Sequence, residues 1–135
     1  YKNNDQTELG IVHNPANDSW FLAVAGQGAF NGHMKMRVSK EQKFQDSLFC
    51  FGFFYDRDKA MSATFRCLDE LMRHHIHGIR RFGAAALDLA AVADGSYGAF
   101  FEFELQPWDM AAGILMVEES GGKVTDCVGD NITCH

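Results

Sequence analysis

The stretch Pro107-Trp108-Asp109-Met110-Ala111-Ala112-Gly113-Ile114-Leu115-Met116-Val117-Glu118-Glu119-Ser120-Gly121-Gly122 has the features of a complete α-helix. Proline suits the first helical position, because the N–H group that it lacks would have no partner there. Asp109 falls in the first turn, where its charge meets the positive end of the helix dipole. The positions from there to Val117 are nearly all apolar, and Gly121 supplies the left-handed residue that commonly ends a helix. The sequence therefore predicts a helix buried on most sides.

Asp109 has two interpretations. A carboxylate in the first turn stabilises a helix by about 0.3–1 kcal/mol without any further role. It can also be a metal or substrate ligand, held rigid by the packed helix behind it. From the residues alone, the first interpretation is the more common one.

The whole stretch resembles the second signature of the inositol monophosphatase family. That signature is W-D-x-A-A-G, followed by a helix and E-A-G-G; here only Ser120, in the alanine position, departs from it. In that family the aspartate after the tryptophan binds catalytic magnesium and lies against the substrate. The resemblance therefore implies that Asp109 is both the catalytic residue and a magnesium ligand.

Composition narrows the classes of partner. The chain has 135 residues, the length of one domain, and folding can bury roughly two-thirds of the extended surface of such a chain. It carries 12 basic against 18 acidic residues, a net charge of −6. This balance argues against nucleic acid as a partner, because phosphate backbones are bound by clustered lysine and arginine. It leaves small anionic substrates open, since a bound divalent metal inverts the local field.

The lengths of the apolar runs and the spacing of the cysteines indicate where the protein is located and whether its thiols are reduced. No apolar run reaches the roughly 18–20 residues that span a bilayer, and the start shows no signal-peptide pattern. We therefore expect a cytoplasmic location and no membrane partner. The cysteines form no C-x-x-C pair, and Cys127 with Cys134-His135 fits none of the usual zinc spacings. We expect reduced thiols rather than a zinc site.

The first third of the chain has the pattern of a small antiparallel sheet. Strands are predicted over residues 8–13, 19–25 and 34–38, with a very short extended piece at Ala29-Phe30 between turn signals. The passage resembles the family's hairpin and its G-x-G-A-F-x-N-G and R-V-S segments. Its glycines are interpreted as turn geometry rather than as chemistry.

The remainder alternates strands with helices. An aromatic core strand is predicted over residues 47–55, an amphipathic helix over 58–74, a strand over 78–83, an alanine-rich helix over 84–93, a strand over 98–105 and the start of another strand at 123–126. The histidines that close the amphipathic helix, His74, His75 and His77, are interpreted as a helix end rather than a metal site. This alternation predicts an α/β layered domain, a sandwich of helices and sheets.

Two predicted elements converge on Asp109: the end of the 98–105 strand and the strand-to-helix turn at Gly83-Ala84-Ala85. Loops at such junctions are where α/β folds bind ligands, and the free N–H groups of a helix start suit an oxygen-rich substrate. Glu102 can accept hydrogen bonds from substrate hydroxyls, although a carboxylate exposed on a strand is equally compatible with its spacing. Asp88, inside the alanine-rich helix, is expected to be a hydrogen-bonded structural carboxylate rather than a site residue.

The segment Gly83-Ala84-Ala85-Ala86-Leu87-Asp88-Leu89-Ala90 resembles the family's G-S-A-A-L-D-L-A. In the family this turn contacts the inositol ring, and the glutamate that matches Glu102 binds a ring hydroxyl. The resemblance therefore implies that Gly83, Ala84, Ala85 and Glu102 bind substrate. Ala84 stands where serine or threonine is common, so one possible side-chain contact is missing while the backbone contacts remain.

The resemblance covers nearly all of residues 1–135, but the family's first signature, D-P-x-D-G-T, and its upstream metal-binding glutamate do not occur here. It implies an α/β portion from the C-terminal half of the inositol monophosphatase/sugar phosphatase fold, truncated at both ends. This chain alone is then expected to be inactive, because magnesium needs several oxygen ligands and Asp109 supplies one carboxylate.

For the full-length protein, the resemblance implies magnesium-dependent hydrolysis of a phosphate monoester, inositol monophosphate to inositol and phosphate, by a homodimer. Within the same class, a 3′(2′),5′-bisphosphate nucleotidase or a fructose-1,6-bisphosphatase-type sugar phosphatase stays open, since both share the W-D motif. From a different class, a non-catalytic dimerising or binding module stays open as well.

Overall fold

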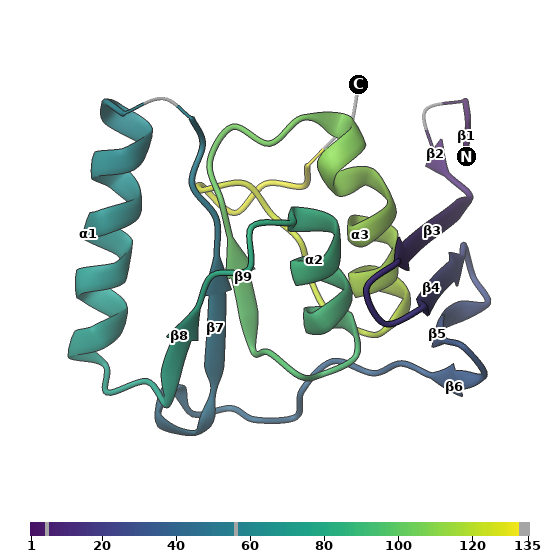
Figure 1. The fold of residues 1–135 in the computed structure, drawn as a ribbon, viewed down its shortest axis with the longest axis horizontal. Helices are drawn as coiled ribbons and strands as arrows, with labels where there is room; N and C mark the ends of the chain where they lie inside the picture. Colours follow the sequence, from purple (N-terminus) through teal and green to yellow (C-terminus); the bar gives the residue numbers. More distant parts are fainter. Residues whose placement is uncertain (5, 56, 133–135) are drawn as a thin grey trace.

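The computed structural model describes residues 1–4, 6–55 and 57–132. Figure 1 shows the order of its elements along the chain. They are β1 (Lys2–Asn3), β2 (Gln6–Thr7), β3 (Leu9–Asn14), β4 (Ser19–Val24), β5 (Gly28–Asn31), β6 (Met34–Lys35), a 3₁₀ turn (Phe44–Asp46), β7 (Leu48–Phe51), α1 (Lys59–Arg73), β8 (Gly78–Arg80), α2 (Ala85–Ala93), β9 (Ala99–Phe101) and α3 (Pro107–Glu119).

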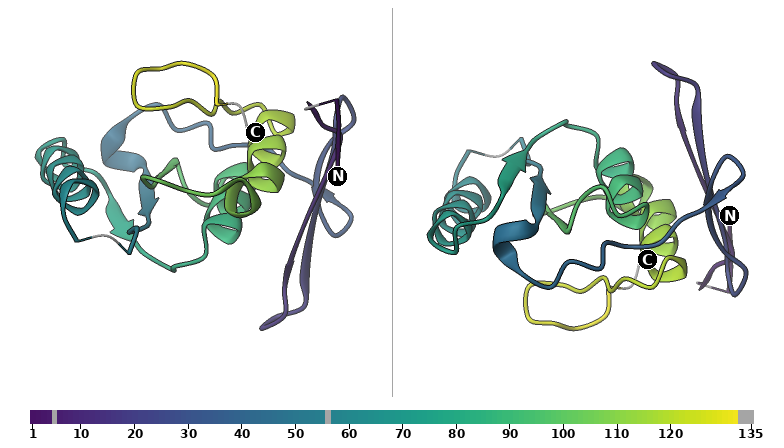
Figure 2. Two further views of the ribbon diagram at one scale, coloured as in Figure 1. Left: turned by 90° about the horizontal axis from the view of Figure 1, so that it is seen from above. Right: turned by 90° about the horizontal axis from the view of Figure 1, so that it is seen from below.

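These elements form layers. Helix α1 lies outside a three-stranded sheet of order β8-β7-β9, helices α2 and α3 lie behind that sheet, and a four-stranded sheet of order β3-β4-β5-β6 covers their far side (Figures 1 and 2). The predicted α/β sandwich is thus confirmed. No helix in the described part of the chain is long and apolar enough to cross a membrane.

The antiparallel sheet forms as predicted over its first two strands, which pair from Leu9↔Val24 to Asn14↔Ser19. The predicted strand over residues 34–38 is too long, because β6 ends at Lys35. Beyond it, the N–H of Val38 donates to the carbonyl of Ser120 at 3.1 Å, so the chain leaves the sheet to meet the end of α3.

The second sheet is parallel throughout: β7 pairs with β8 on one side and with β9 on the other. The carboxyl ends of its strands therefore share one edge. As predicted, the aromatic strand is core, with Phe49 and Phe51 each 8% exposed. Strands β7 and β9 are both shorter than predicted: β7 ends at Phe51 and β9 at Phe101, just before Gly52 and Glu102 pack against each other.

The strand predicted at residues 123–126 is wrong. The segment has no regular secondary structure, and no described strand pairs with it. It runs instead into a turn in which the Asp126 carboxylate accepts the N–H groups of Val128 and Asp130, each at 2.9 Å. A carboxylate that satisfies its own neighbouring backbone competes with a sheet ladder, which explains the difference.

Helix α1 begins after Asp58, whose carboxylate caps the N–H of Lys59, and ends at Arg73. Its predicted apolar stripe is only partly covered, since Phe65 is 54% and Met72 61% exposed in the described structure. His74 stacks on Phe44 with ring centroids 5.2 Å apart, in keeping with the interpretation of this histidine as part of the helix end.

The core lies between α2, α3 and the two sheets. Its fully buried centre includes Ala23, Cys50, Ala90 and Met116, each 0% exposed. Helices α2 and α3 approach closely because α3 carries Gly113 at their contact: a Cβ there would lie 2.5 Å from the Cβ of Leu89.

The far end of α3 is tied to the antiparallel sheet. The Glu119 carboxylate accepts the N–H groups of Gly26 at 2.6 Å and Gly28 at 2.8 Å, both at the turn between β4 and β5. Charge-assisted bonds of this kind are stronger than neutral ones, so both ends of α3 have fixed positions.

Candidate active site

The candidate site lies at the carboxyl edge of the parallel sheet. Helix α2 begins after β8 and α3 begins after β9, so both helix N-termini reach this edge (Figure 1). Open α/β sheets bind ligands at this kind of edge, where strand ends and helix N-termini meet. The structure therefore brings Gly83-Ala84-Ala85, Glu102 and Asp109 to one end of the molecule, as the sequence predicts.

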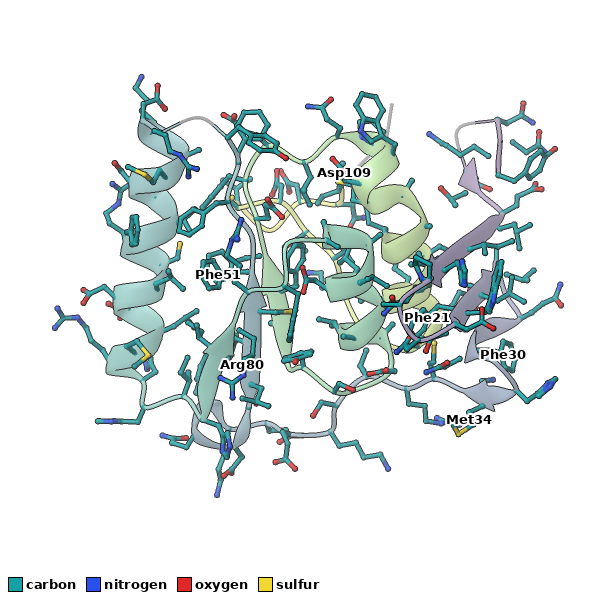
Figure 3. All side chains as sticks on the ribbon, viewed as in Figure 1. Phe21, Phe30, Met34, Phe51, Arg80 and Asp109 are labelled. Carbon is teal, nitrogen blue, oxygen red and sulfur yellow. The ribbon has the colours of Figure 1, made fainter. Side chains whose placement is uncertain are left out.

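Asp109 lies at the mouth of α3, facing the same end (Figure 3). One carboxylate oxygen accepts the N–H of Gln106 at 3.2 Å, which fixes the first turn of the helix. The other oxygen has no hydrogen-bond partner among the described residues, and the side chain is half-buried. Neighbouring Trp108 is 79% exposed. The carboxylate thus stabilises the helix start and has one oxygen without a protein partner, a geometry that is compatible with both interpretations of its role.

Glu102 follows directly after β9 and is half-buried rather than exposed on a strand. Burial raises the pKa of Glu102, and the carboxylates of Asp88 and Asp109 raise that pKa further. A carboxylate in such a partly desolvated position is a strong hydrogen-bond acceptor for a hydroxyl group.

Gly52, at the end of β7, makes room for Glu102, because a Cβ at residue 52 would overlap the Glu102 carboxyl group. The sequence interpretation did not include this glycine. The signal that could have found it is its position, one residue after a strand of buried aromatic residues.

We predict that Gly52→Ala displaces the Glu102 carboxyl group and weakens substrate binding. In the full-length protein, KM for the substrate should rise about tenfold, equivalent to about 1.4 kcal/mol, with a smaller change in kcat. Steady-state kinetics measure this. In a Glu102→Ala background the same glycine substitution should add nothing, and an additive effect would show that Gly52 acts through another group.

The turn before α2 provides backbone donors. Gly83 has a φ of +88°, a conformation that glycine adopts without strain, and it directs the chain into the helix. Ala84 is the N-cap residue and makes no side-chain cap. The first N–H groups of a helix have no partner within it, so those that follow Ala84 are available to a ligand.

The positive charge of Arg81 acts on two carboxylates near the site, those of Asp88 and Glu102. The Arg81 guanidinium lowers the pKa of both Asp88 and Glu102 and lies 5.6 Å from the centroid of the Phe53 ring, in a cation–π arrangement. The sequence interpretation assigned no role to Arg81. Local sequence could not reveal this pairing, because Phe53 follows β7 and lies far from Arg81 along the chain.

Asp88 differs from its predicted state. It is buried, 1% exposed, as expected of a structural residue. However, neither carboxylate oxygen has a hydrogen-bond partner in the described structure, so the expected hydrogen bonds are absent. Burial raises its pKa to about 6.

The structure also tests whether the site suits magnesium. No three His, Cys, Asp or Glu side chains gather into a metal site within residues 1–4, 6–55 and 57–132. The free oxygen of Asp109 is a hard carboxylate donor, the type that Mg²⁺ prefers. The chemistry of this ligand therefore fits, as one member of a larger set. The Cys134-His135 pair lies outside the described residues.

A hollow of about 880 Å³ opens beside this edge. Its walls include Glu102, Met110 and Ile114 on one side, and Cys67 of α1 and the C-cap residue His74 on the other. Glu102 therefore borders two spaces, the acidic edge that it shares with Asp109 and this largely apolar hollow. The sequence did not indicate the hollow, because its walls come from elements far apart along the chain.

The architecture is that of a layered α/β domain with a candidate acidic site at the carboxyl edge of its parallel sheet. Comparison with known proteins identifies the family: residues 1–134 match the inositol monophosphatase family. The chain belongs to this family.

Individual relatives agree. The chain is 38% identical to the Nus factor SuhB of Haemophilus influenzae over 90% of its own length and 45% of the relative, and 38% identical to an inositol-1-monophosphatase of Caulobacter vibrioides over 86% and 45%. Among solved structures, the extragenic suppressor protein suhB from Bartonella henselae superposes with a TM-score of 0.87 at 44% identity, covering 93% of this chain and 48% of that one. The chain thus spans about half the length of these relatives.

Proposed function

We propose that the full-length protein containing this chain hydrolyses a phosphate monoester, inositol monophosphate, in a magnesium-dependent reaction. The observation that carries the proposal is the convergence of Asp109, Glu102 and the uncapped start of α2 at one sheet edge, in a member of the inositol monophosphatase family. The relative from Caulobacter vibrioides, named an inositol-1-monophosphatase, supports the substrate.

In this proposal each group of the chain has a distinct task. The Glu102 carboxylate accepts a hydrogen bond from a hydroxyl of the substrate and orients its ring. The N–H groups at the start of α2 donate to substrate oxygens. Asp109 holds the metal through the oxygen that is not bonded to Gln106 and so fixes the phosphate end of the substrate.

Asp109 would hold magnesium together with ligands from outside these 135 residues. When bound, the ion supplies electrostatic stabilisation of the phosphoryl oxygens, which phosphate monoester hydrolysis needs because the uncatalysed reaction is very slow. The rigid mouth of α3 keeps the Asp109 carboxylate in place, so that little reorganisation accompanies the reaction.

The direct test is a phosphate-release assay on the full-length protein with inositol monophosphate, adenosine 3′,5′-bisphosphate and fructose 1,6-bisphosphate, with and without Mg²⁺. We expect the highest kcat/KM for inositol monophosphate and no release after chelation. A preference for either bisphosphate would move the substrate assignment to a nucleotidase or a sugar phosphatase. The 135-residue chain alone should release no phosphate.

A second candidate is a non-catalytic binding module. The relative from Haemophilus influenzae is named a Nus factor, and the open face of the antiparallel sheet exposes apolar side chains, among them Ile11 and Trp20, each 52% exposed. Substitution of Asp109 separates the candidates, because a binding role does not need the carboxylate. The homodimer and the cytoplasmic location stay predictions, to be tested by light scattering and cell fractionation.

A further inference from the structure

The turn between β3 and β4 carries an ordered cluster of side chains that the proposed reaction does not use: His13, Asp18 and Trp20. The imidazole ring of His13 stacks on the indole ring of Trp20, with centroids 4.0 Å apart and planes 17° from parallel. One carboxylate oxygen of Asp18, Oδ1, accepts both the His13 Nε2–H at 3.0 Å and the Trp20 indole N–H at 3.1 Å. A carboxylate can only accept, so the His13 ring carries a proton on Nε2. The two rings and the carboxylate therefore hold one another in place.

This cluster is exposed at a projecting tip. Trp20 is 52% exposed, and the side chain of Asp18 is 85% exposed. Both views of Figure 2 show the β3–β4 hairpin extending past the helices and the parallel sheet. A single exposed apolar residue needs no explanation, but a tryptophan held in one orientation is different. Rigid aromatic side chains lose little entropy on binding, and tryptophan is enriched among the residues that dominate the binding energy of protein interfaces.

The indole ring of Trp20 is covered on one side only. His13 covers it from β3, where the two residues lie directly opposite each other in the ladder. On the other side of Trp20 the neighbouring residue is Gly32, whose N–H donates to the Trp20 carbonyl at 2.9 Å. Gly32 has no side chain, and a Cβ at this residue would meet no atom within 4 Å. The indole ring is therefore stacked on its His13 side and open toward Gly32.

The Asp18 carboxylate is also only half used. Its second oxygen, Oδ2, has no hydrogen-bond partner among the described residues, and no lysine or arginine in that part of the chain forms an ion pair with it. The hydrogen bonds from His13 and Trp20 lower the pKa of Asp18, so the group is charged at neutral pH. A negative charge thus lies beside an open aromatic ring, an arrangement that attracts cations.

We propose that the β3–β4 tip is a docking site for an arginine side chain of a partner protein: the guanidinium group stacks on the open face of Trp20 and donates to Asp18 Oδ2. Arginine suits this site better than lysine, because its planar group stacks on an aromatic ring and donates hydrogen bonds at the same time. The inference does not depend on the proposed function, since none of these residues belongs to the candidate active site.

The kind of partner follows from charge and shape. The Asp18 carboxylate and the net charge of −6 repel the phosphates of a nucleic acid, although bases also stack on tryptophan. Small molecules bind in concave sites, whereas the hairpin tip projects from the molecule. A projecting tip is accessible to a second polypeptide, and arginine is enriched where proteins meet.

The test uses the isotope-labelled full-length protein and a peptide probe, acetyl-Ala-Ala-Arg-Ala-Ala-amide. The NMR signal of the Trp20 indole N–H reports binding, and the indole of Trp108, which is also exposed but lies at the start of α3, is the internal reference. We expect the Trp20 signal to shift saturably with the peptide. The matched peptide with citrulline, which has nearly the same shape without the charge, should bind about tenfold more weakly.

Asp18→Asn is the decisive variant. The asparagine carbonyl can still accept from His13 and Trp20, so the cluster should keep its shape while it loses its charge. Affinity for the arginine peptide should fall about tenfold, and affinity for the citrulline peptide should stay within about twofold. Asp46→Asn is the matched control, because Asp46 is an exposed carboxylate in the 3₁₀ turn, and it should bind both peptides as the wild type does. Trp20→Leu, followed through the amide signal of Gly32, should bind the arginine peptide at least about tenfold more weakly.

The contrary outcomes are equally specific. Equal affinity for the arginine and citrulline peptides, or unchanged affinity in Asp18→Asn, overturns the inference. Tighter binding of free arginine or of adenosine monophosphate than of the peptide at Trp20 also overturns it, because the tip would then be a metabolite or nucleotide site. If Trp20→Leu does not fold, the citrulline peptide and Asp18→Asn still decide. Phosphate release plays no part in these measurements, so a failure of the proposed function leaves the test intact.

Discussion

Replacing Asp109 with asparagine is expected to lower kcat for phosphate monoester hydrolysis by about a thousandfold or more in the full-length protein. In the proposed site the loss has this size because the substitution removes a preorganised negative charge that would hold the magnesium ion facing the substrate. Steady-state assays at saturating substrate over a range of Mg²⁺ concentrations measure it. The apparent affinity for Mg²⁺ should fall in the same experiment.

The helix start should survive this substitution. An asparagine side-chain carbonyl can still accept the N–H of Gln106, the bond that Asp109 makes at 3.2 Å. Circular dichroism and thermal unfolding should therefore change little. Asp69→Asn is the control for the change in charge, because Asp69 lies on α1 and is 67% exposed. Unchanged turnover in Asp109→Asn would favour the binding-module candidate.

Replacing Gly113 with alanine is expected to destabilise the fold by about 1–3 kcal/mol, the usual cost of overpacking a core. An alanine at an ordinary helical glycine position stabilises by up to about 1 kcal/mol, so the sign itself is diagnostic. The reason is local: the added Cβ would lie 2.5 Å from the Cβ of Leu89, an atom that cannot move without its helix. Urea unfolding at constant m-value measures the change.

A double-mutant cycle isolates this contact. Leu89→Ala alone should cost about 2–5 kcal/mol through the cavity that it leaves. In the Gly113→Ala background it should cost clearly less, since the new methyl group occupies part of that cavity. A Gly113→Ala protein as stable as wild type would mean that α2 and α3 separate without penalty.

The helices were the most predictable part of the fold. Pro107, the apolar run and the terminal glycines determine α3 locally, and Asp58 determines the start of α1 through its own carboxylate. Strand lengths were less predictable. Strands β7 and β9 end where Gly52 and Glu102 meet, and β6 ends where Val38 turns to Ser120; each is a contact between segments far apart in sequence.

The candidate site was predictable through its motif residues, because Asp109, Glu102 and the turn at Ala84 are each recognisable along the chain. Their support was not. Gly52, Arg81 and the burial of Asp88 depend on how β7, the α2 turn and β9 lie side by side, which periodicity does not reveal. The strand predicted at residues 123–126 failed for the same reason, since pairing needs a neighbouring edge.

Helices α2 and α3 form a layer that packs against both sheets. Ala23 on β4 and Cys50 on β7 belong to one hydrophobic core together with the buried residues of these two helices. Neither sheet retains a hydrophobic interior if that layer is removed. Splitting the chain in the connection between β6 and β7 should therefore leave the N-terminal fragment, which carries the antiparallel sheet without the helical layer, unstructured on its own. Mixing it with the C-terminal fragment, which contains α2 and α3, should restore the sheet.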